Sequence, residues 1–218
     1  MRTTETELGT LETVAWVALE GAFDALAAGG LPCGAAISDA TGQIVARGRN
    51  HAYDPVTGSD VLEGTPVAHA ELNALARVPT SRDLSGDILW STQQPCAMCT
   101  SAIEFCGVGD TRYLAADPAF VATDDMRAGL INDPTRDHPE LTVWAILANA
   151  LFLQPSITRG DTSRLDRNNA NEPETVAAAE SVAAVMPIRG LPELIRMLAT
   201  NLEALAHERL KRMASTKP

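Results

Sequence analysis

Aromatic side chains are scarce in this sequence. Phe, Trp and Tyr together make up 4% of the 218 residues, whereas hydrophobic residues of all kinds make up 45%. The core must therefore be built mostly from Ala, Val, Leu and Ile. Single-stranded nucleic acids are usually held by stacking their bases on aromatic side chains, so the shortage also weighs against a protein of that class.

Positive charge is scarce as well, above all in the first half of the chain. The formal net charge is -11 at pH 7, and the lysines, Lys211 and Lys217, stand near the C-terminal end. Up to Asp110 there are five arginines and fourteen acidic residues. Such a surface repels phosphate, which disfavours nucleic acid as a partner. Arg47 and Arg49 could form at most a small local patch.

Long hydrophobic runs are also absent. The longest apolar stretch, Leu141 to Leu153, is interrupted by Thr142 and Asn149. It is shorter than the ~20 residues that a membrane-spanning helix needs. The first residues are polar and acidic, without the apolar segment of a signal peptide. We therefore expect a soluble cytoplasmic protein without a membrane partner.

Cysteine occurs four times, which is too few for a disulfide scaffold in a chain of this length. Hydrophobic periodicity instead predicts an ordinary core. We expect helices over residues 10–28, 65–77 and 95–105, the first capped by Thr10 and the second with Pro66 in its first turn. We expect strands over residues 33–37, 43–47, 87–92 and 111–115, with a loop at 50–64. This alternation is typical of an α/β domain with helices packed on a central sheet.

The last third of the chain is harder to assign. Residues 139–154 are strongly apolar, but periodicity does not decide between a helix and a final strand. Residues 156–174 are polar and rich in Asn, Arg and Asp, so we expect a long loop there. Two helices should follow, about 174–186 and 191–213, and the second carries an apolar stripe made of Leu194, Leu198, Leu202 and Leu205. We therefore divide the chain into an α/β domain, residues 1–140, and a helical extension, residues 141–218, that packs on it.

Two short motifs carry the chemistry, and each falls at the start of an expected helix. In Pro95-Cys96-Ala97-Met98-Cys99 the two cysteines are three residues apart, so their sulfurs share one face of the first turn. The positive end of a helix favours thiolate. His69, in Ala68-His69-Ala70-Glu71, adds a neutral nitrogen. Three protein ligands with a fourth position open are typical of catalytic zinc, since structural sites are closed by four.

Glu71 lies two residues after His69 and is predicted to be catalytic without being a ligand. At the first turn of a helix over the metal, both side chains can reach the open position. A carboxylate there can accept a proton from an attacking water molecule and pass it to a departing amine. Alone, Glu71 would be an ordinary first-turn carboxylate favoured by the helix dipole.

The two motifs together form the H-x-E…P-C-x-x-C signature of zinc deaminases. The chain resembles the cytidine/deoxycytidylate deaminase superfamily, on the branch that holds tRNA adenosine deaminases, guanine deaminases and yeast-type cytosine deaminases. The similarity covers roughly residues 10–125 and includes Pro32-Cys33-Gly34-Ala35, Gly48-Arg49-Asn50 and Ile103. It implies a three-layer α/β/α fold with a mixed central sheet, and a homodimer.

Some features depart from the family pattern. Gln94 stands where family members usually carry Glu before the Pro-Cys pair, which removes one charge near the metal. Residues after Ala116 lack the glycine-rich loop expected of tRNA adenosine deaminases. Beyond about residue 140 the chain follows no pattern known from the family.

The resemblance also suggests residues for a substrate pocket. It makes Asn50 a hydrogen-bonding partner for the edge of the ring, although Asn is also an ordinary turn residue. Cys33 stands where guanine deaminases place a stacking aromatic. The alternative, which the residue type favours, is that Cys33 is a small buried residue of the strand. Ala70 is assigned to the pocket, as are Asp117 and Phe120, for which a plain loop after the last expected strand is the other interpretation.

The sequence thus predicts a zinc-dependent hydrolase that removes the exocyclic amine of a free nucleobase, a nucleoside or a related heterocycle and releases ammonia. A tRNA adenosine deaminase is the second hypothesis, which the acidic chain disfavours. A non-catalytic zinc-binding protein is the third. Glu71 argues against it, because a structural zinc site has no use for that carboxylate.

Overall fold

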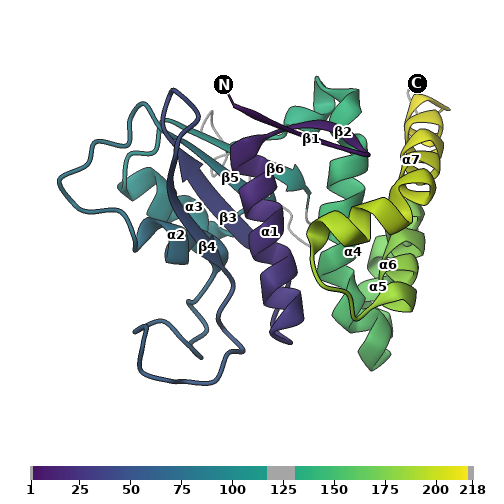
Figure 1. The fold of residues 1–218 in the computed structure, drawn as a ribbon, viewed down its shortest axis with the longest axis horizontal. Helices are drawn as coiled ribbons and strands as arrows, with labels where there is room; N and C mark the ends of the chain where they lie inside the picture. Colours follow the sequence, from purple (N-terminus) through teal and green to yellow (C-terminus); the bar gives the residue numbers. More distant parts are fainter. Residues whose placement is uncertain (1, 117–130, 216–218) are drawn as a thin grey trace.

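The computed structural model describes residues 2–116 and 131–215, and its centre is a mixed β-sheet (Figure 1). In the described residues the sheet has five strands, in the order β4-β3-β5-β6-β7. β3 is antiparallel to β4 and β5, whereas β6 is parallel to β5 and β7. The strands are β3 (Gly34–Ser38), β4 (Ile44–Arg49), β5 (Ile88–Gln93), β6 (Asp110–Ala115) and β7 (Ile131–Asn132). The mixed α/β architecture confirms the predicted fold class.

Helices cover both faces of the sheet: α1 (Thr13–Ala27), α2 (Ala70–Leu75) and α3 (Ala97–Phe105). Neighbouring strand residues point to opposite faces. In β3 and β5, Ala36 and Trp90 belong to the apolar core shared with α1, whereas Ile37 and Leu89 belong to a second core with α2 and α3. The sheet therefore lies between α1 on one side and α2 and α3 on the other, which gives the three layers.

Two glycines allow the helices to approach the sheet closely. A Cβ atom on Gly34 would lie 2.6 Å from the backbone nitrogen of Ala22 in α1. A Cβ atom on Gly48 would lie 2.5 Å from the backbone nitrogen of Ala74 and would also strike the carbonyl oxygen of Ala70, both in α2. Glycine at these positions is what permits α1 to pack on β3 and α2 to pack on β4.

Four helices form the C-terminal part of the structure: α4 (Thr142–Arg159), α5 (Thr162–Asn171), α6 (Pro173–Val185) and α7 (Leu191–Ser215). Most of the apolar segment over residues 139–154, which periodicity could not assign, lies in the helix α4. α4 contacts α1, β5 and β6 on one side and α6 and α7 on the other (Figure 1). Three leucines of the α7 stripe, Leu194, Leu198 and Leu202, are buried, and Leu205 is partly buried against the same core.

The apolar character of α4 agrees with its central place. The segment Pro139–Arg159 is long and apolar enough to cross a membrane by length and composition, but 78% of its most apolar 18-residue window is buried inside the structure. A helix that is hydrophobic on all sides is also typical of a protein core. Its contacts with the sheet and with α1, α5, α6 and α7 are those of a core helix.

The prediction of a long loop over residues 156–174 is wrong. α4 continues to Arg159 and ends at Gly160, whose φ of 71° is left-handed, and α5 follows. The polar composition of this segment suggested a loop, but some of its polar side chains make tertiary contacts within the folded protein. Asn168 of α5 is buried, and its Oδ1 accepts a hydrogen bond of 3.2 Å from Nδ2 of Asn149 in α4.

The N-terminal segment and two helix starts also differ from expectation. β1 (Thr3–Thr6) and β2 (Gly9–Glu12) form an antiparallel hairpin that was not predicted. Thr10 lies in β2 and caps no helix, because α1 begins at Thr13. The second helix begins at Ala70, five residues later than expected. Between β7 and α4 lie two short 3₁₀ helices, Pro134–Arg136 and Pro139–Leu141.

Candidate metal centre

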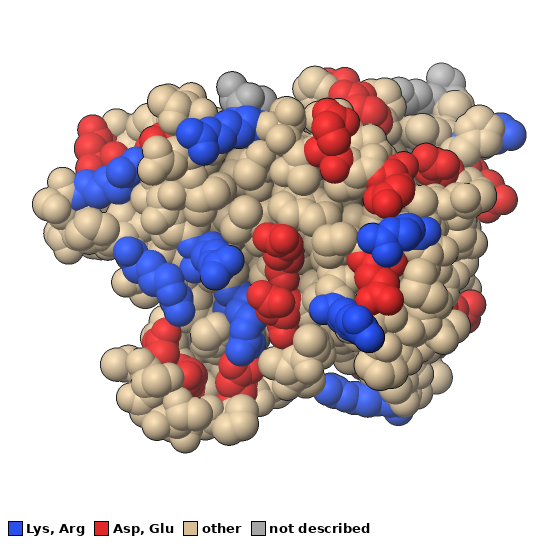
Figure 2. All heavy atoms as spheres, in the orientation of Figure 1, with Lys and Arg blue, Asp and Glu red and all other residues tan. Residues whose placement is uncertain are grey.

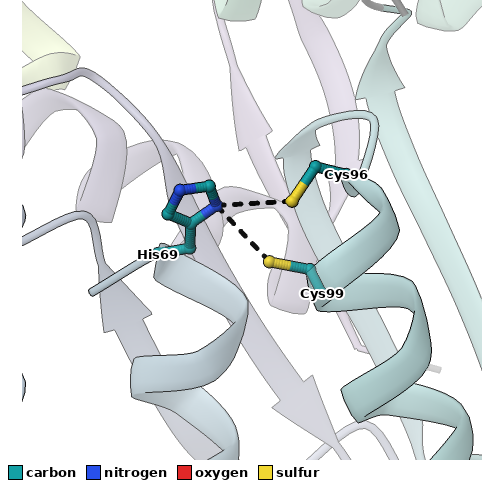
Figure 3. Close-up of side chains that lie close together, drawn as sticks. All are labelled: His69, Cys96 and Cys99. Carbon is teal, nitrogen blue, oxygen red and sulfur yellow. Dashed lines mark hydrogen bonds between the residues drawn. The ribbon is translucent and has the colours of Figure 1, made fainter. Parts of the chain in front are cut away.

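The two sequence motifs meet where two helices begin. His69 is the N-cap residue of α2, and Cys96 is the N-cap residue of α3. Both have an extended backbone, with ψ of 155° and 170°. Cys99 lies in the first turn of α3. Figure 3 shows the imidazole of His69 pointing at both sulfur atoms across the space between the helix starts.

The spacing of the three donor atoms fits zinc. Nδ1 of His69 lies 3.6 Å from Sγ of Cys96 and 3.5 Å from Sγ of Cys99, and all three atoms are within 4.8 Å of one another. Zinc binds sulfur at about 2.3 Å and imidazole nitrogen at about 2.05 Å, which in a tetrahedron places the two donors about 3.6 Å apart. The residues present therefore match a tetrahedral zinc site in chemistry and in distance.

The thiols of Cys96 and Cys99 are shifted in opposite directions in pKa. Hydrogen bonds from Cys99 and His69 lower the pKa of the Cys96 thiol to about 3. The hydrogen bond with Cys96, together with burial, raises the pKa of the Cys99 thiol. The same Cys96 sulfur raises the pKa of His69. Cysteine sulfurs bind a metal as thiolates, so metal binding would release the proton of the Cys99 thiol.

Glu71 lies beside this group with its carboxylate buried. The residue is 6% exposed, and burial raises the pKa of its side chain. Its Oε1 accepts a hydrogen bond of 3.0 Å from Oγ of Ser91 in β5, and its Oε2 lies 3.4 Å from Sγ of Cys99. The carboxylate is therefore oriented by the sheet and lies against Cys99, one of the three candidate ligands. Ser91 was not singled out in the sequence, where one serine in a strand gives no signal.

The buried side-chain amide of Asn73 holds the segment that carries His69 in place through hydrogen bonds. Nδ2 of Asn73 donates to the carbonyl oxygens of Arg49 at 2.9 Å and Ala68 at 3.1 Å. The backbone nitrogen of His51 donates to the same Ala68 carbonyl at 2.9 Å. The residue before the histidine is thus held to the end of β4 from two sides. Asn73 was not singled out in the sequence, where a polar residue in a helix does not show that it will be buried; the structure reveals it as a fully buried polar side chain with hydrogen-bond partners.

Asn50 follows β4 and is 2% exposed. Its Oδ1 accepts a hydrogen bond of 3.0 Å from the backbone nitrogen of Ala52, and its own backbone nitrogen donates to the carbonyl of Cys33 at 2.9 Å. The amide oxygen therefore holds a turn, as the ordinary interpretation of Asn expects. A contact between Asn50 and a substrate ring stays a prediction.

The remaining candidates fall into two groups. Cys33 is partly buried and packs against the second core, which contains the fully buried Ala70 at the start of α2. Cys33 and Ala70 are therefore both packed in the core that contains α2. Asp117 and Phe120 lie outside the described residues. Gln94 is buried, and its backbone nitrogen donates to the carbonyl of Ala115 in β6 at 2.8 Å.

Comparison with known proteins points in the same direction as this geometry. Residues 10–115 match the family described as the cytidine and deoxycytidylate deaminase zinc-binding region. Among curated proteins, the chain is 30% identical over 156 residues to the tRNA(Ile)-lysidine synthase of Deinococcus radiodurans. The matched part is 66% of this chain and 23% of that protein, so the chain spans about a quarter of the relative's length.

The solved structures that are similar to the chain include the following three. A guanine deaminase from Bacillus subtilis is 31% identical, with 58% of this chain and 73% of that chain covered and a TM-score of 0.41. A mutant of the protein NE0047 in complex with 8-azaguanine is 22% identical, with 72% and 87% covered and a TM-score of 0.54, a likeness of fold. A structure from work on A-to-I editing by tRNA:A34 deaminases is 28% identical, with 48% and 75% covered and a TM-score of 0.39.

Proposed function

Because this chain belongs to the cytidine and deoxycytidylate deaminase family, whose zinc-binding region it carries at residues 10–115, we propose that it is a hydrolytic deaminase of a small heterocyclic amine. The substrate would be a free nucleobase, a nucleoside or a close analogue. The observation that carries the proposal is the buried carboxylate of Glu71 against the His69, Cys96 and Cys99 donors.

His69, Cys96 and Cys99 would hold Zn²⁺, which in such sites acts as a Lewis acid that makes water nucleophilic near neutral pH. The protein's own part is proton transfer. Glu71 would accept a proton from the attacking water at one carboxylate oxygen and deliver it to the exocyclic nitrogen as the C–N bond breaks. Water and the amine are consumed, and a carbonyl compound and ammonia are formed. Ser91 would keep the carboxylate aimed at the reacting atoms.

A purely structural zinc site does not account for this arrangement. Burying a carboxylate costs free energy unless it is compensated by hydrogen bonds or by charge. Glu71 is buried, and its side chain has Ser91 as one hydrogen-bond partner. A non-catalytic zinc protein would gain nothing from retaining that carboxylate, whereas a deaminase needs it for proton transfer.

The charges of the first half of the chain favour a small substrate over tRNA. Six arginines precede residue 116, and four of them are already paired with carboxylates. The pairs are Arg49–Asp54 at 2.5 Å, Arg77–Asp60 at 3.3 Å, Arg82–Asp87 at 2.8 Å, and Arg112 with Glu12 at 2.9 Å and Asp110 at 2.8 Å. Figure 2 shows acidic side chains next to basic ones on the face of the molecule that it draws. Phosphates would have to compete with these carboxylates for the guanidinium groups.

The tRNA adenosine deaminase remains the second candidate, because a structure from work on tRNA:A34 deaminases is among the similar ones. The guanine deaminase at 31% identity supports the small-molecule alternative. These two hypotheses differ in one measurable property. A tRNA enzyme must act on adenosine within a folded RNA loop, and a small-molecule enzyme must act on the free compound.

The test is ammonia release by the zinc-loaded protein at low salt. Guanine, cytosine, adenine, their nucleosides and triazine analogues form one panel, and an adenosine-containing anticodon stem-loop forms the comparison. We expect turnover of at least one small compound and none of the RNA. Efficient inosine formation in the RNA, without turnover of any small compound, would favour the second candidate. No turnover of either, in a zinc-loaded protein, would favour the non-catalytic alternative.

A further inference from the structure

The last residue of β5 connects the loop that carries Cys96 to the C-terminal helices. Gln93 ends β5, and Gln94 and Pro95 are all that separates it from the cysteine. Gln93 is buried, with 8% of its surface exposed. Its Nε2 donates a hydrogen bond of 3.3 Å to the backbone carbonyl of Ala148 in α4. A residue next to the metal ligands is thereby tied to a helix that lies outside the region matched by the family.

The rest of this cysteine loop, residues 93–96, is held by β6 and by α3 itself. The Gln94 backbone nitrogen donates to Ala115 in β6 at 2.8 Å. The Thr100 nitrogen donates to the carbonyl of Cys96 at 2.8 Å, and its hydroxyl donates to the carbonyl of Pro95 at 3.4 Å. The Gln93 hydrogen bond adds a tie to a third element, α4.

α4 offers a firm anchor at this point. Asn149 follows Ala148, and its Nδ2 lies within hydrogen-bond distance of Oδ1 of Asn168, at 3.2 Å, and Oε2 of Glu172, at 3.3 Å. Glu172 in turn accepts a hydrogen bond of 2.6 Å from Arg209 in α7. The carbonyl that receives Gln93 is thus flanked by a side-chain network that joins α4, α5, the start of α6 and α7. Figure 1 shows α4 between the sheet and α6.

We propose that Gln93 is a positioning residue for the metal centre, and that through it the C-terminal helices fix the place of Cys96. The proposal rests on the zinc site of the proposed function. Metal ligands must keep their distances within about 0.2 Å. Gln93 precedes Cys96 by three positions, so a shift of Gln93 is transmitted to the cysteine, and loosening Gln93 from α4 should loosen the sulfur. Supporting groups of this kind commonly change metal affinity by 10–100-fold.

The test compares zinc binding by full-length variants. Gln93→Met keeps the length of the side chain and removes the donor, and Gln93→Asn keeps the amide but is one methylene too short. Gln154→Met is the matched control, because Gln154 is also a buried glutamine and lies on α4 itself. Zinc affinity is measured by competition with a chromophoric chelator. The absorption bands of the Co²⁺-substituted protein report the geometry of the thiolate ligands, and thermal unfolding of the metal-free proteins reports folding.

We expect both Gln93 variants to bind zinc roughly 10–100-fold more weakly and to shift the Co²⁺ bands, with Gln154→Met unchanged. A folded Gln93→Met with the affinity and spectrum of the wild type would overturn the proposal. So would equal weakening in Gln154→Met, or failure of both Gln93 variants to fold, because the role would then be general packing. A wild-type protein that binds no zinc contradicts the metal site itself, whereas bound zinc with unaffected Gln93 variants contradicts the role of Gln93 alone.

Discussion

Gly48→Ala tests how the fold places α2, the helix whose start carries His69 and Glu71. A Cβ atom at Gly48 would lie 2.5 Å from the backbone nitrogen of Ala74 and would strike the carbonyl of Ala70. Ordinary contacts are about 3.5–4.0 Å, so α2 must move away from β4 by about 1 Å. His69 and Glu71 are at the start of α2 and would move with it, whereas Cys96 and Cys99 are on α3.

A shift of that size is several times the tolerance of about 0.2 Å for metal ligands. We therefore expect Gly48→Ala to bind zinc at least roughly tenfold more weakly and to lose most of its turnover. Overpacking should also cost about 1–3 kcal/mol of unfolding free energy, or roughly 2–12 °C in Tm. Chelator competition, ammonia release and thermal unfolding measure the three effects.

Two further glycines serve as controls. Gly86→Ala should change nothing, because a Cβ atom there meets no atom within 4 Å. Gly34→Ala should lower Tm by disturbing α1, which carries none of the three donor residues. Wild-type zinc affinity and turnover in Gly48→Ala would refute the reasoning, and so would equal losses of zinc affinity in Gly86→Ala.

Three other predictions follow from the site and its supports. Glu71→Gln should keep its zinc and lose roughly 10²–10⁴-fold in kcat, as expected for loss of a proton carrier; loss of the metal, shown by elemental analysis, would instead make Glu71 a ligand. Ser91→Ala should lower kcat roughly tenfold without changing zinc content, because one hydrogen bond to a carboxylate is worth about 1.5–3 kcal/mol, and Ser91→Thr should restore it; an unchanged kcat would show that the contact has no role in orientation. A chain that ends at Gly160 should be insoluble or strongly destabilised, since α4 would lose the cover of α6 and α7; a soluble truncation with wild-type Tm would contradict this.

The sequence was informative where chemistry or periodicity is local. Cys96 and Cys99 are three residues apart, and His69 precedes Glu71 by two, so spacing alone suggested the metal ligands. The short apolar runs of β3 and β5 likewise marked the central strands, because a strand covered by helices on both faces is buried along its length. These features need no knowledge of distant parts of the chain.

The sequence was uninformative where contacts join distant segments. Ser91 meets Glu71 across 20 positions, Asn73 meets Arg49 across 24, and Gln93 meets Ala148 across 55. A polar residue in the sequence carries no sign of which partner it will find. The same cause explains the wrong loop over residues 156–174, where buried hydrogen bonds such as that of Asn168 stabilise a helix of polar composition.

Zinc stoichiometry in the purified protein tests the central claim most directly. Elemental analysis of the wild type and of Cys96→Ala, both prepared in the same zinc-containing medium and then dialysed, gives the number of zinc ions per chain. We expect one zinc per chain in the wild type, because two thiolates and one imidazole suit this metal, and almost none in Cys96→Ala. A wild-type protein without zinc, or unchanged zinc in Cys96→Ala, would contradict the account.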